Sequence, residues 1–261
     1  MDYTFTCERF DIRRTLFCGQ AFRWKELDGR FCGIAGGRYA EISDNGDSTY
    51  TVHGIEKSDI SYWQSYFDLD TDYDALIKQF SEDEHMKLAC KENPGIRVLR
   101  QEPFETLISF IISQNNNIKR ITGIIDRLCE NFGEKTDKGY MFPTLEKLVG
   151  VTAEDLAPLR AGFRARYIVD AVEKLSSGEV SLDGIKAMDT AAAREELKRI
   201  KGVGDKVADC VLLFGYHKTD AFPRDVWIKR IEQKLYPDGL PECIKGCLLY
   251  TSPSPRDRSL S

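Results

Sequence analysis

The sequence predicts an α+β fold, in which an N-terminal antiparallel β-domain is followed by an all-helical domain. Three observations support this prediction. Residues 1–56 contain short alternating segments separated by turn dipeptides, as antiparallel strands do. From near Ser58 to about Tyr236, the apolar residues recur at helical spacing instead. Two of the helical segments are joined by Gly202-Val203-Gly204, a glycine hairpin rather than a long loop.

The composition is typical of a globular protein, with 42% apolar residues, 30% charged residues and a net charge of −5 over 261 residues. The charge is unevenly distributed. Residues 1–90 hold ten Lys and Arg against seventeen Asp and Glu, a net charge of −7, which leaves +2 on residues 91–261. We therefore expect a polyanion to meet the second part of the chain, through a local basic patch.

The N-terminal region predicts a small β-domain built from hairpins. The run FRWK at 22–25 alternates between apolar and charged residues, and Asp28-Gly29 is a turn pair. A second extended run, from Phe31 to Ile42, is followed by Asn45-Gly46, another hairpin signal. We expect a β-rich first domain over residues 1–90, including its connecting helices.

The second part of the chain predicts a helical domain over residues 91–247. Thr152 with Asp155 resembles a capping box, which is a helix-start signal. The last stretch, LLYTSPSPRDRSLS, is rich in Ser and Pro, so we expect residues 248–261 to be a disordered or foreign tail. Helical periodicity is clearest over 73–81, 103–113, 117–131, 143–149, 152–159, 164–176, 190–200, 205–216 and 226–236.

The glycine hairpin directly precedes a lysine. Gly202 and Gly204 allow backbone amides to come close to a ligand, and unpaired amides at the start of the next helix suit a phosphate. Lys206 lies on that first turn and shares a helix face with Cys210. An amine at this position is a candidate nucleophile of a nucleic-acid enzyme. The alternative is a lysine that packs its stem on apolar surface and keeps its head in water.

Asp225 stands at the start of the helical segment 226–236. Its simplest role is that of a helix N-cap, which Asp fills well. A carboxylate held on a rigid helix start can also act chemically. Because Lys206 and Asp225 each stand at a helix start, the two side chains can converge on one pocket.

Two further clusters predict contacts with DNA. The run Asn115-Asn116-Asn117, followed by Arg120, is either an interhelix turn or a set of amides that read base edges. In the segment 160–167, basic and aromatic residues alternate around Phe163 and Arg164. That pattern suits phosphate contacts combined with a wedge between bases, and otherwise a basic helix start.

With these residues in place, the chain resembles the helix-hairpin-helix DNA glycosylase superfamily and, within it, the 8-oxoguanine DNA glycosylase/AP lyases. The resemblance covers about residues 5–247. The GVG hairpin alone would be a weak signal, but the segments together are specific. They are CGQAFRW (18–24), SFIISQNNNIKRITGIIDRLC (109–129), AGFRARY (161–167), GVGDKVADC (202–210) and FPRDVW (222–227).

The resemblance implies a role for each matching residue. Lys206 would attack the sugar C1′ and form a Schiff base, from which the strand is cut by β-elimination. Asp225 would assist base departure and stabilise the positive charge that develops on the sugar. The carbonyl of Gly19 would read the N7 hydrogen of 8-oxoguanine, and Cys210 would form part of the wall of the base pocket. The orphaned cytosine would be held by Asn115, Arg120 and Arg164. Phe163 would act as a wedge in the base stack, and the hairpin at Gly202 and Gly204 would contact the DNA backbone.

We expect no metal or cofactor, because the eight cysteines form no CxxC pair and only three histidines are present. The expected partner is double-stranded DNA that contains oxidised guanine. No stretch approaches the roughly 20 apolar residues that span a bilayer, so we expect no membrane partner. We also expect the enzyme to be a monomer and to lie in the cytoplasm, associated with the nucleoid if the source is bacterial. Two alternatives stay open: an alkylated-base glycosylase, which would need no lysine, and a non-catalytic helix-hairpin-helix DNA-binding module.

Overall fold

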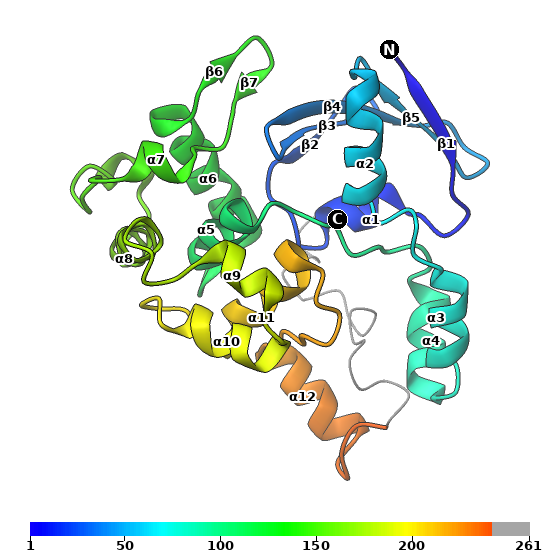
Figure 1. Cartoon of the computed structure of the whole chain (residues 1–261). Helices are drawn as coiled ribbons and strands as arrows, with labels where there is room; N and C mark the ends of the chain where they lie inside the picture. Colours follow the sequence, from blue (N-terminus) through cyan, green and yellow to red (C-terminus); the bar gives the residue numbers. More distant parts are fainter. Residues whose placement is uncertain (242–261) are drawn as a thin grey trace. The chain divides into compact units, whose positions relative to one another are not determined.

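The structure, a computed structural model, describes residues 1–241 and confirms the predicted α+β class (Figure 1). The chain forms two compact units. Unit 1 comprises Met1–Gly33, Ala40–Arg100 and the segment from Thr219 onward. Unit 2 comprises Ile34–Tyr39 and Gln101–Lys218. The predicted tail at 248–261 lies outside the described residues, and the proposed boundaries 1–90 and 91–247 stay predictions.

The N-terminal sheet has five antiparallel strands in the order β1-β5-β4-β3-β2. Both predicted turn pairs connect neighbouring strands, and Asp28 and Gly29 have φ angles of 49° and 78°, as a tight two-residue hairpin requires. Trp24 pairs with Gly33, where a Cβ atom would lie 2.5 Å from the indole ring. The strands are β1 Tyr3–Thr6, β2 Trp24–Leu27, β3 Arg30–Ala35, β4 Arg38–Asp44 and β5 Thr49–His53.

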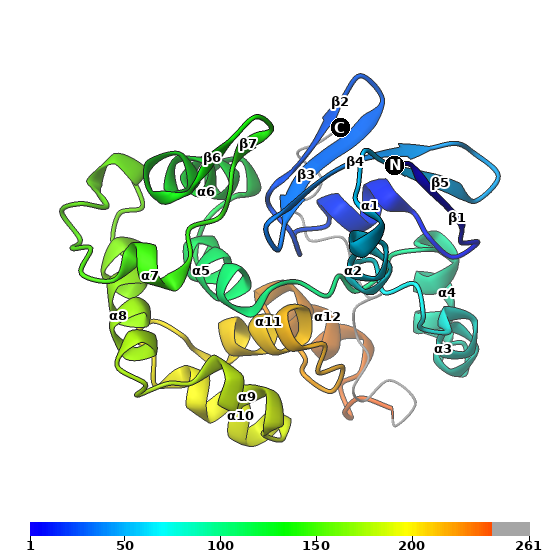
Figure 2. The same ribbon diagram turned by 45° about the horizontal axis from the view of Figure 1, so that its top comes forward.

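Two helices cover one face of this sheet, as Figure 2 shows for α1 and α2. Trp63 of α2 meets Trp24 edge to face, with ring centroids 6.0 Å apart. The Trp24 indole N–H donates to the Tyr66 hydroxyl at 2.8 Å, so the buried ring also has its polar group paired. Phe17 of α1 packs against Phe31 of the sheet. This aromatic layer is the core of the β-domain.

The helices follow the predicted periodicity with one clear error. The segment 152–159 is a turn and a short 3₁₀ helix, not an α-helix. Thr152 and Asp155 do make the reciprocal capping bonds, at 2.9 and 3.2 Å, but Pro158 has no N–H with which to continue an α-helical ladder. The helices are α1 Ile12–Phe17, η1 Lys57–Asp59, α2 Ile60–Tyr66, α3 Tyr73–Phe80, α4 Glu84–Glu92, α5 Pro103–Ser113, α6 Ile118–Phe132, α7 Leu145–Leu148, η2 Ala157–Leu159, α8 Arg164–Ser176, α9 Leu182–Ala187, α10 Thr190–Lys198, α11 Asp205–Tyr216 and α12 Val226–Leu235, and a small hairpin is formed by β6 Lys135–Thr136 and β7 Gly139–Tyr140.

Within the described residues, no helix is both long and apolar enough to cross a membrane. The helices that periodicity did not predict are mostly short. Helix α1 interrupts a region that we expected to be all strand, because six residues are too few to show a helical period. Its start is nevertheless marked, since the Asp11 carboxylate accepts from the Arg14 amide at 2.8 Å.

A buried carboxylate connects the β-domain to the segment that leaves it. Asp68 is 1% exposed and has a left-handed backbone, with φ of 53°. It accepts from the Arg100 Nε at 2.9 Å, the Thr71 hydroxyl at 2.7 Å and the Tyr73 hydroxyl at 2.8 Å. A buried charge is tolerated when it is paired and hydrogen-bonded in this way.

We expect Asp68→Asn to lower the free energy of unfolding by about 3 kcal/mol, because it leaves Arg100 without its buried counter-charge. Asn tolerates the left-handed backbone, so the effect reports the charge rather than strain. Urea denaturation gives the measurement, with exposed Asp70→Asn as the control, expected to fall within about 0.5 kcal/mol of wild type. Equal stability of the two variants would contradict this account.

The segment after Thr219 returns to unit 1 and completes a second core. Phe222, Tyr236 and Leu240 pack against the buried residues of α3 and α4. The Tyr236 hydroxyl donates to Asp83, the N-cap of α4, at 2.6 Å. Burial alone would raise the pKa of Asp83, but hydrogen bonds from Tyr236 and the Met86 amide bring this pKa below its ordinary value.

This lowered pKa predicts an acid-sensitive contribution to stability. A carboxyl group whose folded pKa is depressed stabilises the fold above its unfolded pKa of about 4 and loses that contribution as the pH falls through the lower folded value. We expect Tyr236→Phe to reduce stability at pH 7 and to flatten its decline below pH 4. Thermal unfolding from pH 7 to 3 tests this. Parallel pH curves for variant and wild type would show that the bond to Asp83 contributes nothing.

Candidate active site

The glycine hairpin is formed as predicted, and it leads directly into α11. Gly202 has a φ of 84°, a left-handed conformation that favours glycine. Gly204 is the N-cap of α11 and, as a glycine, makes no side-chain capping bond to the first turn of the helix. Val203 between them is buried and anchors the hairpin. Uncapped amides at a helix start suit an anion such as a phosphate.

Lys206 lies on the first turn of α11 and is half-buried. Its Nζ atom is 5.2 Å from the centroid of the Phe110 ring, which belongs to α5. That ring stacks on Phe214, with centroids 5.5 Å apart and an interplanar angle of 14°. Cys210, one turn after the lysine, is 2% exposed. The amine therefore projects over an aromatic wall, with its stem on the apolar side of α11.

Asp225 is the N-cap of α12, as one of its two predicted roles requires. Its Oδ1 atom accepts from the amides of Trp227 and Ile228 at 2.9 and 2.8 Å. The neighbouring Arg224 donates from its Nε to the Glu232 carboxylate on α12 at 2.9 Å. Asp225 belongs to unit 1 and Lys206 to unit 2.

The loop after α5 presents Asn115 and is held by Arg164. Asn115 is exposed and has a φ of 46°. Arg164 is 2% exposed; its Nε donates to the Gln114 carbonyl at 2.8 Å and its Nη2 to the Asn115 carbonyl at 2.9 Å. Burial, and then the nearby charge of Arg120, lower the pKa of the Arg164 guanidinium. The contact of Arg164 with an orphaned base stays a prediction, whereas its contacts with this loop are present.

The side chains of Phe163 and Arg120 are exposed, whereas that of Arg164 is buried. Phe163 is 50% exposed, and the Arg164 guanidinium lies 4.5 Å from its ring centroid. Arg120 is exposed on the first turn of α6, where its amide donates to Asn117. Unit 2 thus places Asn115, Arg120, Phe163 and Arg164 near one loop, and their contacts with DNA stay predictions.

Gly19 follows α1 in a tight turn of unit 1, with φ of 89°. The next residue, Gln20, fixes that turn. Its amide nitrogen donates to the carbonyls of Thr15 and Arg97 at 2.8 Å each, and its oxygen accepts from the Leu99 amide at 2.9 Å. Gln20, which the sequence patterns do not single out, thus holds the backbone of the turn that carries Gly19.

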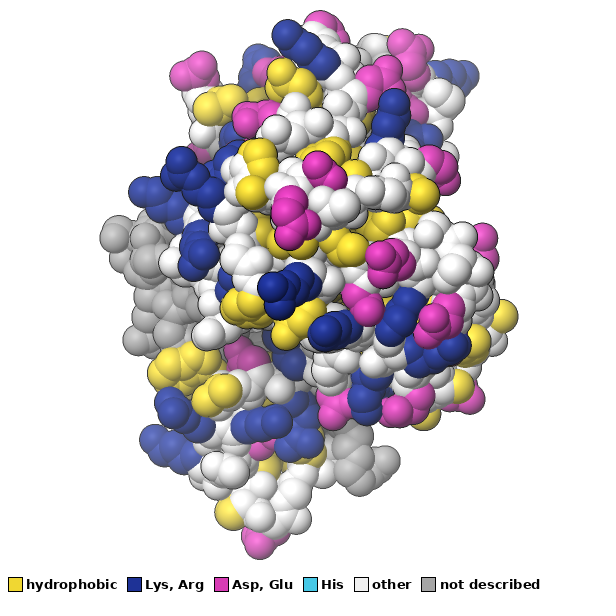
Figure 3. Space-filling model, turned by 90° about the vertical axis from the view of Figure 1, so that its left-hand side faces the viewer, with side chains coloured by type: hydrophobic (Ala, Val, Ile, Leu, Met, Phe, Trp, Pro, Cys, Tyr) yellow, Lys and Arg dark blue, Asp and Glu magenta, His cyan; other side chains and the backbone are white. Residues whose placement is uncertain are grey.

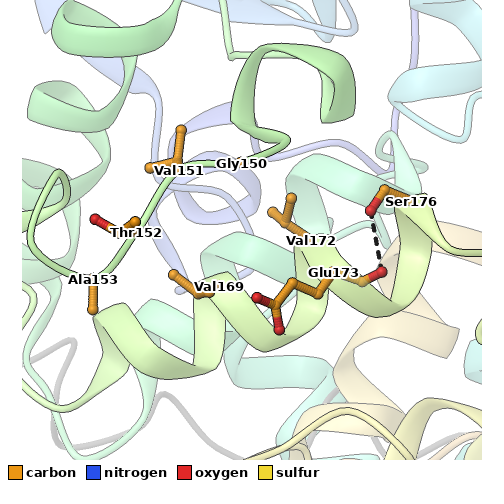
Figure 4. A pocket seen from close by; sticks show the side chains of 8 residues that line it. All are labelled: Gly150, Val151, Thr152, Ala153, Val169, Val172, Glu173 and Ser176. Carbon is orange, nitrogen blue, oxygen red and sulfur yellow. Dashed lines mark hydrogen bonds between the residues drawn. The ribbon is translucent and has the colours of Figure 1, made fainter.

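The face of the molecule with α7 and α8 shows Lys and Arg side chains interspersed with Asp and Glu (Figure 3). A cavity of about 280 Å³ lies between residues 150–153 and α8 (Figure 4). Val151, Val169 and Val172 line it together with Glu173, and none of the predicted site residues does.

Two aromatic residues of the site were also missed. Phe110 lies in the segment 109–129 and Tyr167 in the segment 161–167, but the sequence patterns predict a role for neither. The Phe110 ring contacts Lys206, and the Tyr167 ring lies against Gly202. Spacing could not reveal either contact, because each joins two segments that are far apart in sequence.

Comparison with known proteins places the chain in a family. Residues 3–107 match the 8-oxoguanine DNA glycosylase N-terminal domain, and residues 108–241 match the HhH-GPD superfamily of base excision DNA repair proteins. The N-glycosylase/DNA lyase of Saccharomyces cerevisiae is 39% identical over 192 residues, which are 67% of this chain and 51% of that relative, so the chain spans about half of it. The probable N-glycosylase/DNA lyase of Methanothermobacter thermautotrophicus is 32% identical over 264 residues, covering 87% of this chain and 83% of that relative.

Solved structures agree with these relatives. The 8-oxoguanine glycosylase/lyase of Clostridium acetobutylicum in its apo-form has a TM-score of 0.86 at 38% identity, covering 92% of this chain and 86% of that one. The same enzyme in complex with dsDNA containing cytosine opposite 8-oxoG has a TM-score of 0.85, covering 94% and 89%. The chain belongs to the 8-oxoguanine DNA glycosylase/AP lyases of the helix-hairpin-helix superfamily.

Proposed function

We propose that this chain excises 8-oxoguanine from duplex DNA and then cuts the strand by β-elimination, with Lys206 as the nucleophile and Asp225 as the essential carboxylate. The observation that supports this most directly is the position of Lys206. It lies on the first turn of a helix whose N-terminal amides have no side-chain cap, directly after a glycine hairpin. A DNA strand bound to those amides would lie within reach of the amine.

The chemistry needs both residues. The Lys206 amine attacks C1′ while the bond to the base breaks, and the base leaves with the electron pair of that bond and takes up a proton. The attacking nitrogen loses a proton, and the sugar ring opens as the C1′–O4′ bond breaks and O4′ is protonated, which leaves a C1′=N Schiff base. Asp225 supplies negative charge where the sugar becomes positive. The resulting Schiff base acidifies the neighbouring sugar carbon, so loss of a proton there expels the 3′ phosphate. Because a stacked base is inaccessible, the base must first leave the helix.

The other predicted residues have supporting roles in this proposal. Phe163 is exposed enough to enter the base stack, while Asn115 and Arg120 lie on the surface where they can contact the orphaned cytosine. Gly19 would discriminate 8-oxoguanine from guanine, since guanine has a hydrogen-bond acceptor at N7 and no hydrogen. Cys210 would form part of the base pocket. Gly202 and Gly204 would present amides to the phosphate backbone.

Borohydride trapping tests the proposal. The full chain is incubated with duplex containing 8-oxoguanine opposite cytosine, and sodium borohydride reduces any Schiff base to a stable adduct. We expect a covalent protein–DNA complex. Base release without an adduct would favour a glycosylase that works without the lysine, such as one for alkylated bases. Binding with neither adduct nor base release would favour a non-catalytic DNA-binding module.

The proposal also includes a monomeric enzyme in the cytoplasm, associated with the nucleoid if the source is bacterial. A molecular mass near 29.7 kDa in sedimentation would support the monomer. A concentration-dependent mass near twice that value would contradict it.

A further inference from the structure

We propose that Tyr167 is a positioning residue, whose ring fixes the distance between α8 and the hairpin Gly202-Val203-Gly204 and connects that hairpin to Phe163. This inference rests on the proposed function, since it concerns how the hairpin is presented to DNA. All the residues involved belong to unit 2.

The ring of Tyr167 lies directly against the hairpin backbone. A Cβ atom at Gly202 would lie 2.3 Å from Cδ2 of that ring and 2.6 Å from Cε2. No real Cβ atom approaches another heavy atom this closely, so glycine at position 202 serves two needs, a left-handed backbone and contact with an aromatic ring. The ring thereby determines how far the hairpin stands from α8.

The same ring contacts the predicted wedge. Phe163 and Tyr167 are one helical turn apart, and their rings meet edge to face with centroids 5.6 Å apart and an interplanar angle of 70°. Phe163 is 50% exposed, and Tyr167 is half-buried beneath it. Tyr167 is therefore the shared neighbour of the side chain proposed to enter the base stack and of the backbone proposed to hold the phosphates.

The next turns of α8 hold the segment that precedes the hairpin. The Asp170 carboxylate accepts from the Lys201 amide at 2.6 Å, and the Lys174 Nζ donates to the Arg199 carbonyl. Tyr167, Asp170 and Lys174 follow at spacings of three and four residues, so they share one face of α8. This face contacts three successive parts of the hairpin segment, and Tyr167 contacts the part nearest to α11.

The ring, rather than the hydroxyl, performs this function. Across residues 1–241, the Tyr167 hydroxyl makes no hydrogen bond, whereas the ring contacts both Gly202 and Phe163. Removing the ring lets the hairpin move toward α8, so that the hairpin amides are displaced from the positions in which they would bind the phosphates. Lys206 itself is less affected, because the helix α11 is also fixed through the packing of Phe214 on Phe110.

The test compares Tyr167→Leu with Tyr167→Phe, which retains the ring. Tyr140→Leu is the matched control, because Tyr140 is a half-buried tyrosine on β7 that does not belong to the proposed site. Fluorescence anisotropy measures the Kd for duplex containing 8-oxoguanine opposite cytosine, and single-turnover excision measures the rate at saturating protein. Amide hydrogen exchange of residues 199–206 is followed without DNA.

We expect Tyr167→Leu to raise the Kd about tenfold, a change of about 1.4 kcal/mol in binding free energy, while the saturated excision rate stays within about twofold. Exchange at 199–206 should accelerate in this variant, and Tyr167→Phe should match wild type in all three measurements. Equal loss in the Leu and Phe variants would assign the function to the hydroxyl, and wild-type behaviour of Tyr167→Leu would overturn the inference. If the wild-type chain fails to bind the duplex, the proposed function is wrong, while hydrogen exchange still decides the role of Tyr167.

Discussion

Lys206→Gln is expected to abolish the covalent adduct in borohydride trapping, with no residual band above background. A glutamine amide cannot form a Schiff base, since its nitrogen lone pair is delocalised into the carbonyl. Glutamine is close to lysine in length and is a good helix former, so it should preserve α11 and the contact of the side-chain stem with Phe110. The loss would therefore report chemistry rather than folding.

A second lysine of the same unit provides the control. Lys186 is exposed on α9, and Lys186→Gln should trap as well as wild type. Duplex binding by Lys206→Gln, measured by anisotropy, should stay within about threefold of wild type, because phosphate contacts to backbone amides do not involve the amine. An adduct that persists in Lys206→Gln would reassign the nucleophile to another amine.

Asp225→Asn has the second largest expected effect, a decrease of about a hundredfold or more in the single-turnover excision rate. The structure makes this variant informative. Asp225 caps α12 through bonds to two amides, and asparagine is an equally good N-cap, so the substitution removes the charge but keeps the helix start. Asp225→Ala would remove both and could not separate them.

Asp189→Asn is the matched control for this experiment. Asp189 caps α10 by accepting from the Ala192 amide at 2.8 Å, and the same change there should leave excision at the wild-type rate. Thermal denaturation should show both variants within about 2 °C of wild type, since each retains its cap. If Asp225→Asn excises at the wild-type rate, the carboxylate is a structural cap and no more.

The fold was predictable from the sequence wherever local chemistry determines it. Turn pairs such as Asp28-Gly29 specify a hairpin within two residues, and long amphipathic segments such as 117–131 specify a helix within one residue of the observed bounds. The prediction failed for α1, because an element of six residues is too short to show a helical period. It also failed for 152–159, because Pro158 prevents an α-helix there. The family was predictable because several specific segments occur in one chain.

The positions of the predicted site residues on their elements were predictable, but their contacts within the protein were not, and their roles stay predictions. Lys206 and Asp225 stand at helix starts as expected, yet the aromatic wall behind the lysine comes from α5, almost a hundred residues earlier. Arg164 was expected on an orphaned base, and the structure shows its guanidinium on the carbonyls of the Asn115 loop. Sequence patterns report which residue types are present. They do not report which distant backbone a long side chain reaches.

The return of the chain to unit 1 after Thr219 has a consequence for synthesis. A ribosome makes all of residues 101–218 before Phe222, Tyr236 and Leu240 exist to cover α3 and α4. The aromatic core of the β-domain and the helical unit can therefore form early, while the second core, around α3 and α4, is completed only after Phe222, Tyr236 and Leu240 are made. Asp225 lies in that late segment, so a nascent chain acquires Lys206, the proposed nucleophile, well before Asp225, the proposed carboxylate.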